Sequence, residues 1–219
     1  MESKAAIAVA FALREEAAPF RKLSRGMENI SIFLTGIGRS NAERAARDFL
    51  AAHSPDAVLT CGFAGALAPD LKAGEIVFET GTTPESFCAA WHARLMAAGA
   101  RPAKIFCAGQ IAVTAADKKK LRDETGADAA EMESGAVRAV CRERGIPCAT
   151  VRVISDTAAE DLPLDFNRFL RPDKSVDMSK LFLAAARSPG KIGALMKLQK
   201  QTAFAAEQLA GTLLKVLND

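Results

Sequence analysis

The sequence is poor in the residues that build metal centres and disulfide frameworks. It has two histidines and five cysteines among 219 residues, and no two cysteines form a Cys-x-x-Cys pair. Zinc sites need clustered histidine and cysteine ligands, and disulfide-stapled domains need an even set of cysteines. We therefore predict no metal site, and free thiols of the kind found in a reducing compartment.

An excess of charge of one sign and long apolar runs are also lacking. The 29 Lys and Arg residues against 26 Asp and Glu leave a net charge of +3, too small and dispersed to indicate a nucleic-acid binder. The first apolar stretch, residues 5–13, is too short to span a bilayer and lacks the pattern of an export signal. The expected location is the cytoplasm, and nucleic acid is not an expected partner.

No repeat, low-complexity tract or Gly/Ser-rich linker divides the chain. A length of 219 residues with 49% hydrophobic residues is enough for one large domain with a buried core. We predict a single domain over residues 1–219.

Five short apolar segments have the length of buried β-strands, and segments of helical spacing lie between them. This alternation predicts an α/β fold, with a mixed, mostly parallel twisted sheet flanked by helices. Thr114 and Asp117 form an acidic capping box before one helix. From residue 163 onward strand signals vanish, which predicts a helical C-terminal tail over 163–219. The predicted strands are 5–13, 57–61, 75–79, 105–113 and 148–154, and the predicted helices are 40–53, 84–98, 115–125, 133–144, 178–186 and 191–216.

Glycines mark two further segments. Gly36 and Gly38 precede a helix whose free N–H groups, with Arg39, could bind an anion, although this stretch taken alone favours a tight strand-to-helix turn. This segment lacks the third glycine and the later acidic residue of a dinucleotide site. Gly62 lies in a run of small residues, 60–67, that admits either a ligand or close packing.

Carboxylates stand at the ends of other expected elements. Glu16 follows the first strand, Glu131 and Glu133 precede a helix, and Asp156 ends the last strand. Each is also compatible with a helix cap or a solvated charge. Together they outline one concave site, suited to a reaction with a cationic transition state.

Arg152 lies within an otherwise apolar strand. A buried charge costs several kcal/mol unless it is paired. Arg152 therefore needs a carboxylate partner, which Glu16, Glu131 or Glu133 could supply.

In this order and spacing the segments resemble the purine nucleoside phosphorylase and nucleosidase superfamily, especially its 5′-methylthioadenosine/S-adenosylhomocysteine nucleosidases. The resemblance implies cleavage of a purine N-glycosidic bond through an oxocarbenium-like state, in a homo-oligomer, with a dimer favoured. It covers about residues 5–160 and is carried by Leu-Arg-Glu-Glu16, Gly36-Ile-Gly38-Arg-Ser-Asn41, Gly62-Phe-Ala-Gly65, Glu131-Met-Glu-Ser134 and Arg152-Val-Ile-Ser-Asp156.

The resemblance assigns the catalytic roles to two carboxyl groups. Asp156 would protonate N7 of the purine, and Glu16 would orient or deprotonate an attacking water. Glu133 would hold the ribose 2′ and 3′ hydroxyls, and Met132 would pack on the ribose.

It also implies supporting roles around those groups. Arg152 and Ser155 would position the acids, and residues 110–113, Val113 included, would contact the base through the backbone. Phe63 and Gly62 would lie at the nucleoside. No cofactor is expected.

Two positions depart from the family pattern. Phe63 stands where the family usually has serine, and Thr60 stands where the phosphorylases have a phosphate-binding arginine. Inorganic phosphate as a co-substrate, bound near Gly36, Gly38 and Arg39, therefore stays open beside water.

A narrower likeness concerns residues 131–134 and the tail segment 162–167. These look like the hopanoid-associated phosphorylases, which remove adenine from adenosylhopane. Lys191, Lys197 and Lys200 flank apolar residues in a segment that could touch an anionic membrane at the inner face, or simply cover the sheet. The remaining alternatives are a hydrolytic nucleosidase and a protein that binds a nucleoside without turnover.

Overall fold

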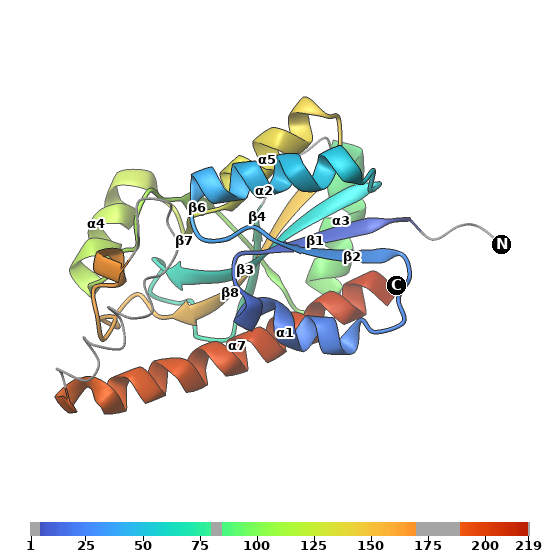
Figure 1. Cartoon of the computed structure of the whole chain (residues 1–219). Helices are drawn as coiled ribbons and strands as arrows, with labels where there is room; N and C mark the ends of the chain where they lie inside the picture. The colour runs from blue at the N-terminus through green and yellow to red at the C-terminus, as the bar shows by residue number, and fades with distance from the viewer. Residues whose placement is uncertain (1–4, 80–84, 170–188, 219) are drawn as a thin grey trace.

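A central β-sheet lies between two layers of helices in this computed structural model, which describes residues 5–79, 85–169 and 189–218. Figure 1 shows α2 and α5 on one face and α1 and α7 on the other. The strands are β1 (Ile7–Phe11), β2 (Ile30–Leu34), β3 (Ala57–Ala66), β4 (Ile76–Glu79), β5 (Arg101–Ala103), β6 (Ile105–Cys107), β7 (Ala129–Glu131) and β8 (Cys148–Asp156). The helices are α1 (Arg14–Leu23), α2 (Arg39–Ala52), α3 (Glu85–Ala97), α4 (Ala115–Thr125), α5 (Ser134–Glu143) and α7 (Ile192–Asn218), with short 3-10 turns η1 (Phe166–Phe169) and η2 (Pro189–Lys191).

The sheet has the order β2-β1-β3-β8-β4-β5, and β7 joins the end of β3 to β6. Strand β1 pairs in parallel with β2 and β3, and β8 pairs in parallel with β3. Two pairs are antiparallel, β4 with β8 and β3 with β7. The predicted α/β class with a mixed, mostly parallel sheet is therefore confirmed.

Strand β1 shows why the buried strands read as continuous apolar runs. Its side chains alternate between the two faces, and each face is covered by helices. Ile7, Val9 and Phe11 enter the core under α1 and α7, whereas Ala8 and Ala10 enter the core under α2 and α5. No position of the strand is left for a polar residue.

Helix α7 has two different halves. In the second half Leu209, Leu213 and Val216 are buried in the core against the sheet. In the first half Ile192 and Met196 are about half exposed, at 47% and 54%, and this half extends beyond the end of the sheet in Figure 1. The predicted helix over 191–216 is confirmed, and the predicted helix over 178–186 lies outside the described residues.

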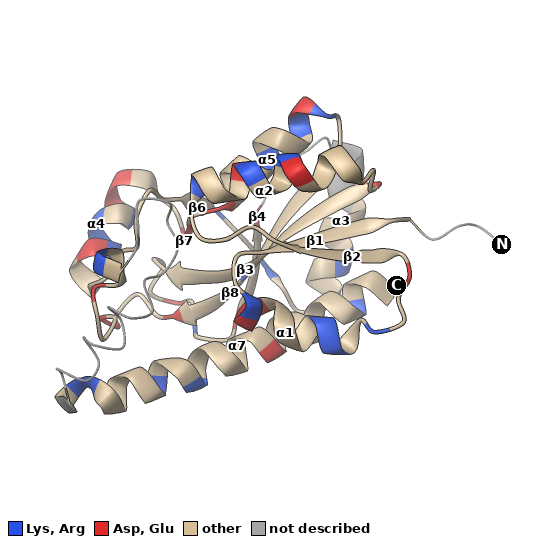
Figure 2. Cartoon of the chain, in the orientation of Figure 1, with Lys and Arg blue, Asp and Glu red and all other residues tan. Residues whose placement is uncertain are grey.

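Charged side chains of both signs are interspersed over the helices, as Figure 2 shows for α2, α4 and α5. No described helix is long and apolar enough to cross a membrane.

Two of the predicted strand boundaries are wrong. The strand predicted over 105–113 ends at Cys107, because the following backbone bonds elsewhere: the amide of Ile111 donates to the side chain of Asn167, and its carbonyl accepts from it. The strand predicted over 57–61 continues to Ala66, because β8 pairs with it as far as Gly65 and β7 pairs with its last two residues. Both changes bear on the site described next.

Candidate active site

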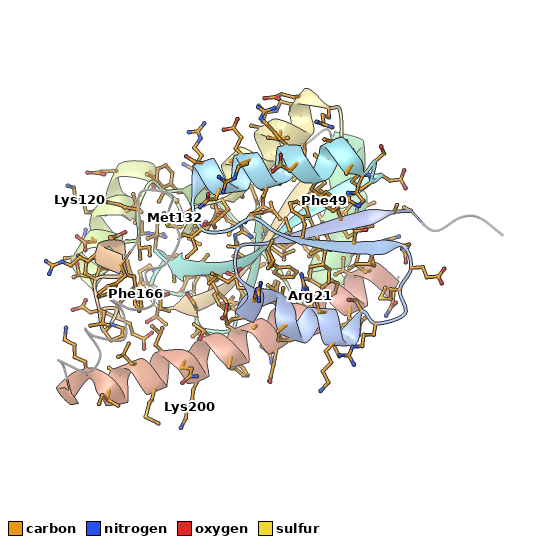
Figure 3. All side chains as sticks on the ribbon, in the orientation of Figure 1. Arg21, Phe49, Lys120, Met132, Phe166 and Lys200 are labelled. Atoms are coloured by element: carbon orange, nitrogen blue, oxygen red, sulfur yellow. The ribbon has the colours of Figure 1, made fainter. Side chains whose placement is uncertain are left out.

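A cavity of about 260 Å³ opens where the carboxyl ends of β1, β3 and β8 meet. Phe11, the last residue of β1, lies opposite Cys61 of β3, so β3 continues past it beside β8. The loop after β6 and the first half of α7 complete the wall. Met132 and Phe166, both labelled in Figure 3, line this cavity.

Glu16 enters the cavity from the first turn of α1 and is held by the backbone. One carboxylate oxygen accepts from the amides of Ala12 and Leu13, both at 2.9 Å, and the other accepts from the amide of Phe63 at 2.9 Å. Burial raises the pKa of Glu16, and these hydrogen bonds oppose the rise. The carboxylate is thereby fixed between β1 and β3.

Gly62 makes room for that carboxylate. A Cβ atom at this position would lie 2.8 Å from Oε1 of Glu16, and the φ of Gly62 is +149°. The predicted place of Gly62 beside the site thus has a steric basis, and Phe63 next to it lines the cavity.

Glu133 lies at the start of α5 and faces the glycine turn. Its Oε1 accepts from the amide of Gly38 at 2.7 Å, and both Gly36 and Gly38 have positive φ angles, of 73° and 82°. Burial, followed by repulsion from Glu131, raises the pKa of Glu133 to about 7.

This contact bears on the predicted anion site. The amide of Gly38 is engaged by Glu133, the side chain of Arg39 is exposed, and Ile37 of the same turn lines the cavity. Anion binding at Gly36, Gly38 and Arg39 stays a prediction.

Arg152 and Glu131 form an ion pair beneath the cavity. Their side chains are 1% and 0% exposed, and Nη2 of Arg152 lies 2.5 Å from Oε2 of Glu131. Nη2 also donates to the hydroxyl of Thr60 at 3.1 Å. Of the three carboxylates that the sequence offered to Arg152, Glu131 is therefore the partner.

Glu131 has a second role, at the start of α5. Its carboxylate accepts from the amides of Glu133 and Ser134 and from the Ser134 hydroxyl. Burial alone would raise the pKa of Glu131, but the charge of Arg152 and these hydrogen bonds lower it to about 2. Glu131 is thus an ionised helix cap.

Asp156, at the end of β8, is held by two side chains. Ser155 donates its hydroxyl proton to Oδ1 at 2.5 Å, and Nζ of Lys118 lies 2.5 Å from Oδ2. Lys118 belongs to α4 and is one residue that the sequence analysis missed. Its run of three lysines is typical of a solvated surface, and only the helical spacing to Leu121 and Thr125 marks position 118 as inward-facing.

The other predicted residues are divided between the cavity and its surroundings. Met132 lines the cavity, as do residues 110–112. Val113 instead lines an adjoining hollow of about 610 Å³, which shares Ala108 and residues 110–112 with the first. Sequence patterns did not indicate the more distant wall residues, since nothing local links them to the site; these are Leu162, Phe166, Leu198 and Thr202.

The carboxyl groups that line the cavity can act as acids and bases. Within the described part of the chain, no three His, Cys, Asp or Glu side chains are placed to hold a metal ion. Glu16, Glu133 and Asp156 all line one mostly apolar cavity. Carboxylates in such surroundings can stabilise a cation that develops between them and can transfer protons.

Known proteins share this sequence pattern at low identity. The 5′-methylthioadenosine/S-adenosylhomocysteine nucleosidase of Shewanella pealeana is 27% identical over 172 residues, which are 65% of this chain and 75% of the relative. The enzyme of the same description from Chromohalobacter salexigens is 27% identical over 186 residues, or 71% of this chain and 78% of the relative.

Solved structures share the fold over almost the whole chain. Futalosine hydrolase of Helicobacter pylori superimposes with a TM-score of 0.71 at 20% identity and covers 97% of both chains. The 5′-methylthioadenosine/S-adenosylhomocysteine nucleosidase of Colwellia psychrerythraea, solved with adenine, gives 0.71 at 17% identity and covers 99% of this chain and 96% of its own.

A family model, that of the phosphorylase superfamily, matches residues 8–93 and 78–187. These two ranges contain Glu16, Glu133, Asp156 and Lys118, so the match includes the charged side chains of the cavity as well as the sheet. The predicted kinship is confirmed, and the chain belongs to the phosphorylase superfamily of nucleoside-cleaving enzymes.

Proposed function

We propose that this enzyme cleaves the N-glycosidic bond of an adenosyl-type purine nucleoside and releases adenine. The observation that carries the proposal is the convergence of Glu16, Glu133 and Asp156, from α1, α5 and β8, on one cavity. The names of the curated relatives, which are nucleosidases of 5′-methylthioadenosine and S-adenosylhomocysteine, support the same substrate class.

Each carboxyl group has a place in that reaction. Asp156 gives a proton to N7 of the purine while the bond from N9 to C1′ breaks, so the base leaves neutral. Glu133 holds the ribose hydroxyls, and its negative charge stabilises the cationic sugar. Glu16 takes a proton from the nucleophile that attacks C1′. Met132 packs against the ribose.

We propose water as the nucleophile. Lys118 is the one cation among the described residues that line the cavity, and it is paired with Asp156. Thr60, at the position of the phosphorylases' arginine, instead accepts a hydrogen bond from Arg152. The carboxylates of Glu16 and Glu133 repel an entering phosphate, which favours water. Inorganic phosphate is the alternative nucleophile.

The 5′ substituent that suits this cavity is apolar. Leu13, Ile37, Phe166 and Leu198 line it, and the first half of α7, which supplies Leu198, exposes further apolar side chains at its surface. We propose that the 5′ substituent is large, such as that of adenosylhopane, and that α7 makes a peripheral membrane contact. We also propose that the protein is cytoplasmic and forms a homo-oligomer.

Adenine release tests the proposed function. The protein is incubated with 5′-methylthioadenosine and with adenosylhopane, each with and without inorganic phosphate. We expect adenine from at least one compound, at a rate independent of phosphate. Dependence on phosphate would identify a phosphorylase. A nucleoside that binds but stays intact would support a binding protein instead.

Gly62→Ala is expected to lower the rate of adenine release about 100-fold, since displacement of a catalytic group by 1 Å can cost that much. The new methyl group would overlap the carboxylate of Glu16, from which it would be 2.8 Å away. Gly99→Ala is the matched control, because Gly99 also has a positive φ but has no atom within 4 Å of such a methyl group. Equal rates for the two variants would contradict the role of Glu16.

The rate of adenine release is expected to fall below about pH 7. Burial and the neighbouring Glu131 raise the pKa of Glu133 from 4.5 to about 7, and protonated Glu133 has no charge to stabilise the sugar cation. In kcat/KM, which reports the free enzyme, this gives a tenfold loss per pH unit on the acid side. Glu133→Gln should be slower and lack this acid limb. If the limb persists, it belongs to another group, such as Glu16.

The same shift has a consequence for stability. Between pH 4.5 and about 7 the folded protein retains the Glu133 proton that the unfolded chain loses. As the pH rises through this range, the free energy of unfolding should therefore fall, and above about pH 7 it should level off. Urea unfolding of the wild type and of Glu133→Gln at several pH values measures the difference, and an equal slope for both proteins would count against the raised pKa.

A further inference from the structure

Lys118 is the feature of the cavity that the proposed reaction leaves unused. Its side chain is 1% exposed, and Nζ lies 2.5 Å from Oδ2 of Asp156. Nζ also donates to the backbone carbonyls of Thr157 at 2.8 Å and Glu160 at 2.7 Å. Lysine is almost never this buried without a partner, and here all three ammonium protons have acceptors.

The charged groups around this pair are engaged elsewhere. The Glu160 carboxylate accepts from Thr157 and pairs with Lys197 of α7. At the start of α4, Asp117 bonds Thr114 and Asp161 accepts from the amide of Ala115. The remaining charged groups of the site are Glu16, Glu131, Glu133 and Arg152. Asp156 is therefore the carboxylate that faces the Lys118 ammonium.

This pairing raises a question of proton supply. A general acid must carry its proton when the leaving group departs. Asp156 instead forms an ion pair with Lys118, with 2.5 Å between Oδ2 and Nζ, and in an ion pair the ammonium is the partner that carries the proton. Two groups donate to Asp156, the Ser155 hydroxyl and the Lys118 ammonium, each at 2.5 Å. The ammonium is much the stronger acid, so the proton that can reach the purine through Asp156 is that of Lys118.

We propose that Lys118 is a positioning residue that holds Asp156 and supplies the proton that Asp156 delivers to the purine. A proton moves from Nζ of Lys118 to the carboxylate of Asp156, and the proton of Asp156 moves to N7. The bond from N9 to C1′ breaks and its electron pair stays on the base. Lys118 is left as a neutral amine and Asp156 as an anion, and the pair regains one proton from solvent. This inference rests on the proposed function.

A merely structural role makes a different prediction. The bonds from Lys118 to Thr157 and Glu160 tie α4 to the chain after β8. Loss of that tie would slow every substrate by a similar factor. Loss of a proton donor slows only those substrates whose leaving group needs a proton.

The test compares two leaving groups in Lys118→Met. Adenine release from the best adenosyl substrate should fall by about 100-fold or more, as expected for loss of general acid catalysis. Release of 4-nitrophenolate from 4-nitrophenyl β-riboside, which departs as a stable anion, should stay within about threefold of the wild-type rate. Equal losses on both substrates would overturn the proposal.

A second measurement decides the matter independently of that substrate. In Lys118→Ala, added ethylammonium should restore adenine release at least tenfold, because it can enter the vacated space and carry a proton. Ethanol at the same concentration should not. Failure of ethylammonium to raise the rate of a variant that remains folded by circular dichroism would contradict the proton supply.

Lys119→Met is the matched control. Lys119 lies on the same helix, with its side chain 75% exposed and paired with Asp123 at the surface, so wild-type rates are expected. If the wild-type protein itself releases no adenine, the proposed function fails. If the wild-type protein releases adenine and the Lys118 variants release it at the same rate, the proposed function stands and this inference alone fails.

Discussion

Asp156→Asn is expected to release adenine about 10² to 10⁴ times more slowly than the wild-type protein, the usual contribution of a general acid. A purine that leaves without a proton on N7 departs as an anion, which is a poor leaving group. Asparagine has nearly the same shape and can still accept the hydroxyl of Ser155, which lies 2.5 Å from Oδ1 of Asp156. It has no acidic proton to transfer, so the reaction should slow even in folded protein. The exchange also removes the negative charge that faces the buried Lys118 ammonium, so the free energy of unfolding should fall by about 3–5 kcal/mol, and the rates are compared where the variant remains folded.

Steady-state assays with 5′-methylthioadenosine, with circular dichroism as the check on folding, measure this loss. Asp161→Asn is the matched control, because the exposed Asp161 accepts from the amide of Ala115 outside the cavity through an oxygen that asparagine retains. A rate above about one tenth of the wild type in Asp156→Asn would show that Asp156 is not the acid.

Elements determined by local patterns could be predicted from the sequence. Helix α4 lies at 115–125 as expected, and Thr114 and Asp117 form its capping box. Strands β1 and β8 were evident because both of their faces are buried. These signals are local, since each depends on residues only a few positions apart.

Helix α1 and the loop after β6 were harder for the same reason. Helix α1 is short, contains Pro19, and buries only Glu16, Ala17 and Phe20, so its charged residues resemble a solvated turn. The loop after β6 has the composition of a strand, but its backbone partner is the side chain of Asn167, far along the chain. The repeating spacing of apolar residues along the sequence carries no information about a partner so far along the chain.

The site shows the same division. Carboxylates that follow a strand could be recognised individually, because the ends of parallel strands meet at one edge. The residues that surround these carboxylates could not be recognised in the same way. The helical spacing of Lys118 to Leu121 marks it only as inward-facing, whereas its pairing with Asp156 depends on how α4 packs against the end of β8.

Arg152→Met is expected to lower the free energy of unfolding by about 3–5 kcal/mol, the usual cost of removing one partner from a buried ion pair. Glu131, 0% exposed, would lose the guanidinium that lies 2.5 Å away and would stay in the core as an unpaired charge. For a chain of this length the melting temperature should fall by on the order of 10 °C.

Urea unfolding of three variants separates the charge from the packing. Arg47→Met is the surface control: Arg47 pairs with Glu43 and Glu143, all of them substantially exposed, and such pairs contribute little. Arg152→Met combined with Glu131→Gln should be more stable than Arg152→Met alone, because glutamine can still accept from the amide of Ser134 and no charge remains buried. If Arg152→Met costs no more than Arg47→Met, the ion pair beneath the cavity does not hold Glu131 and the start of α5 in place.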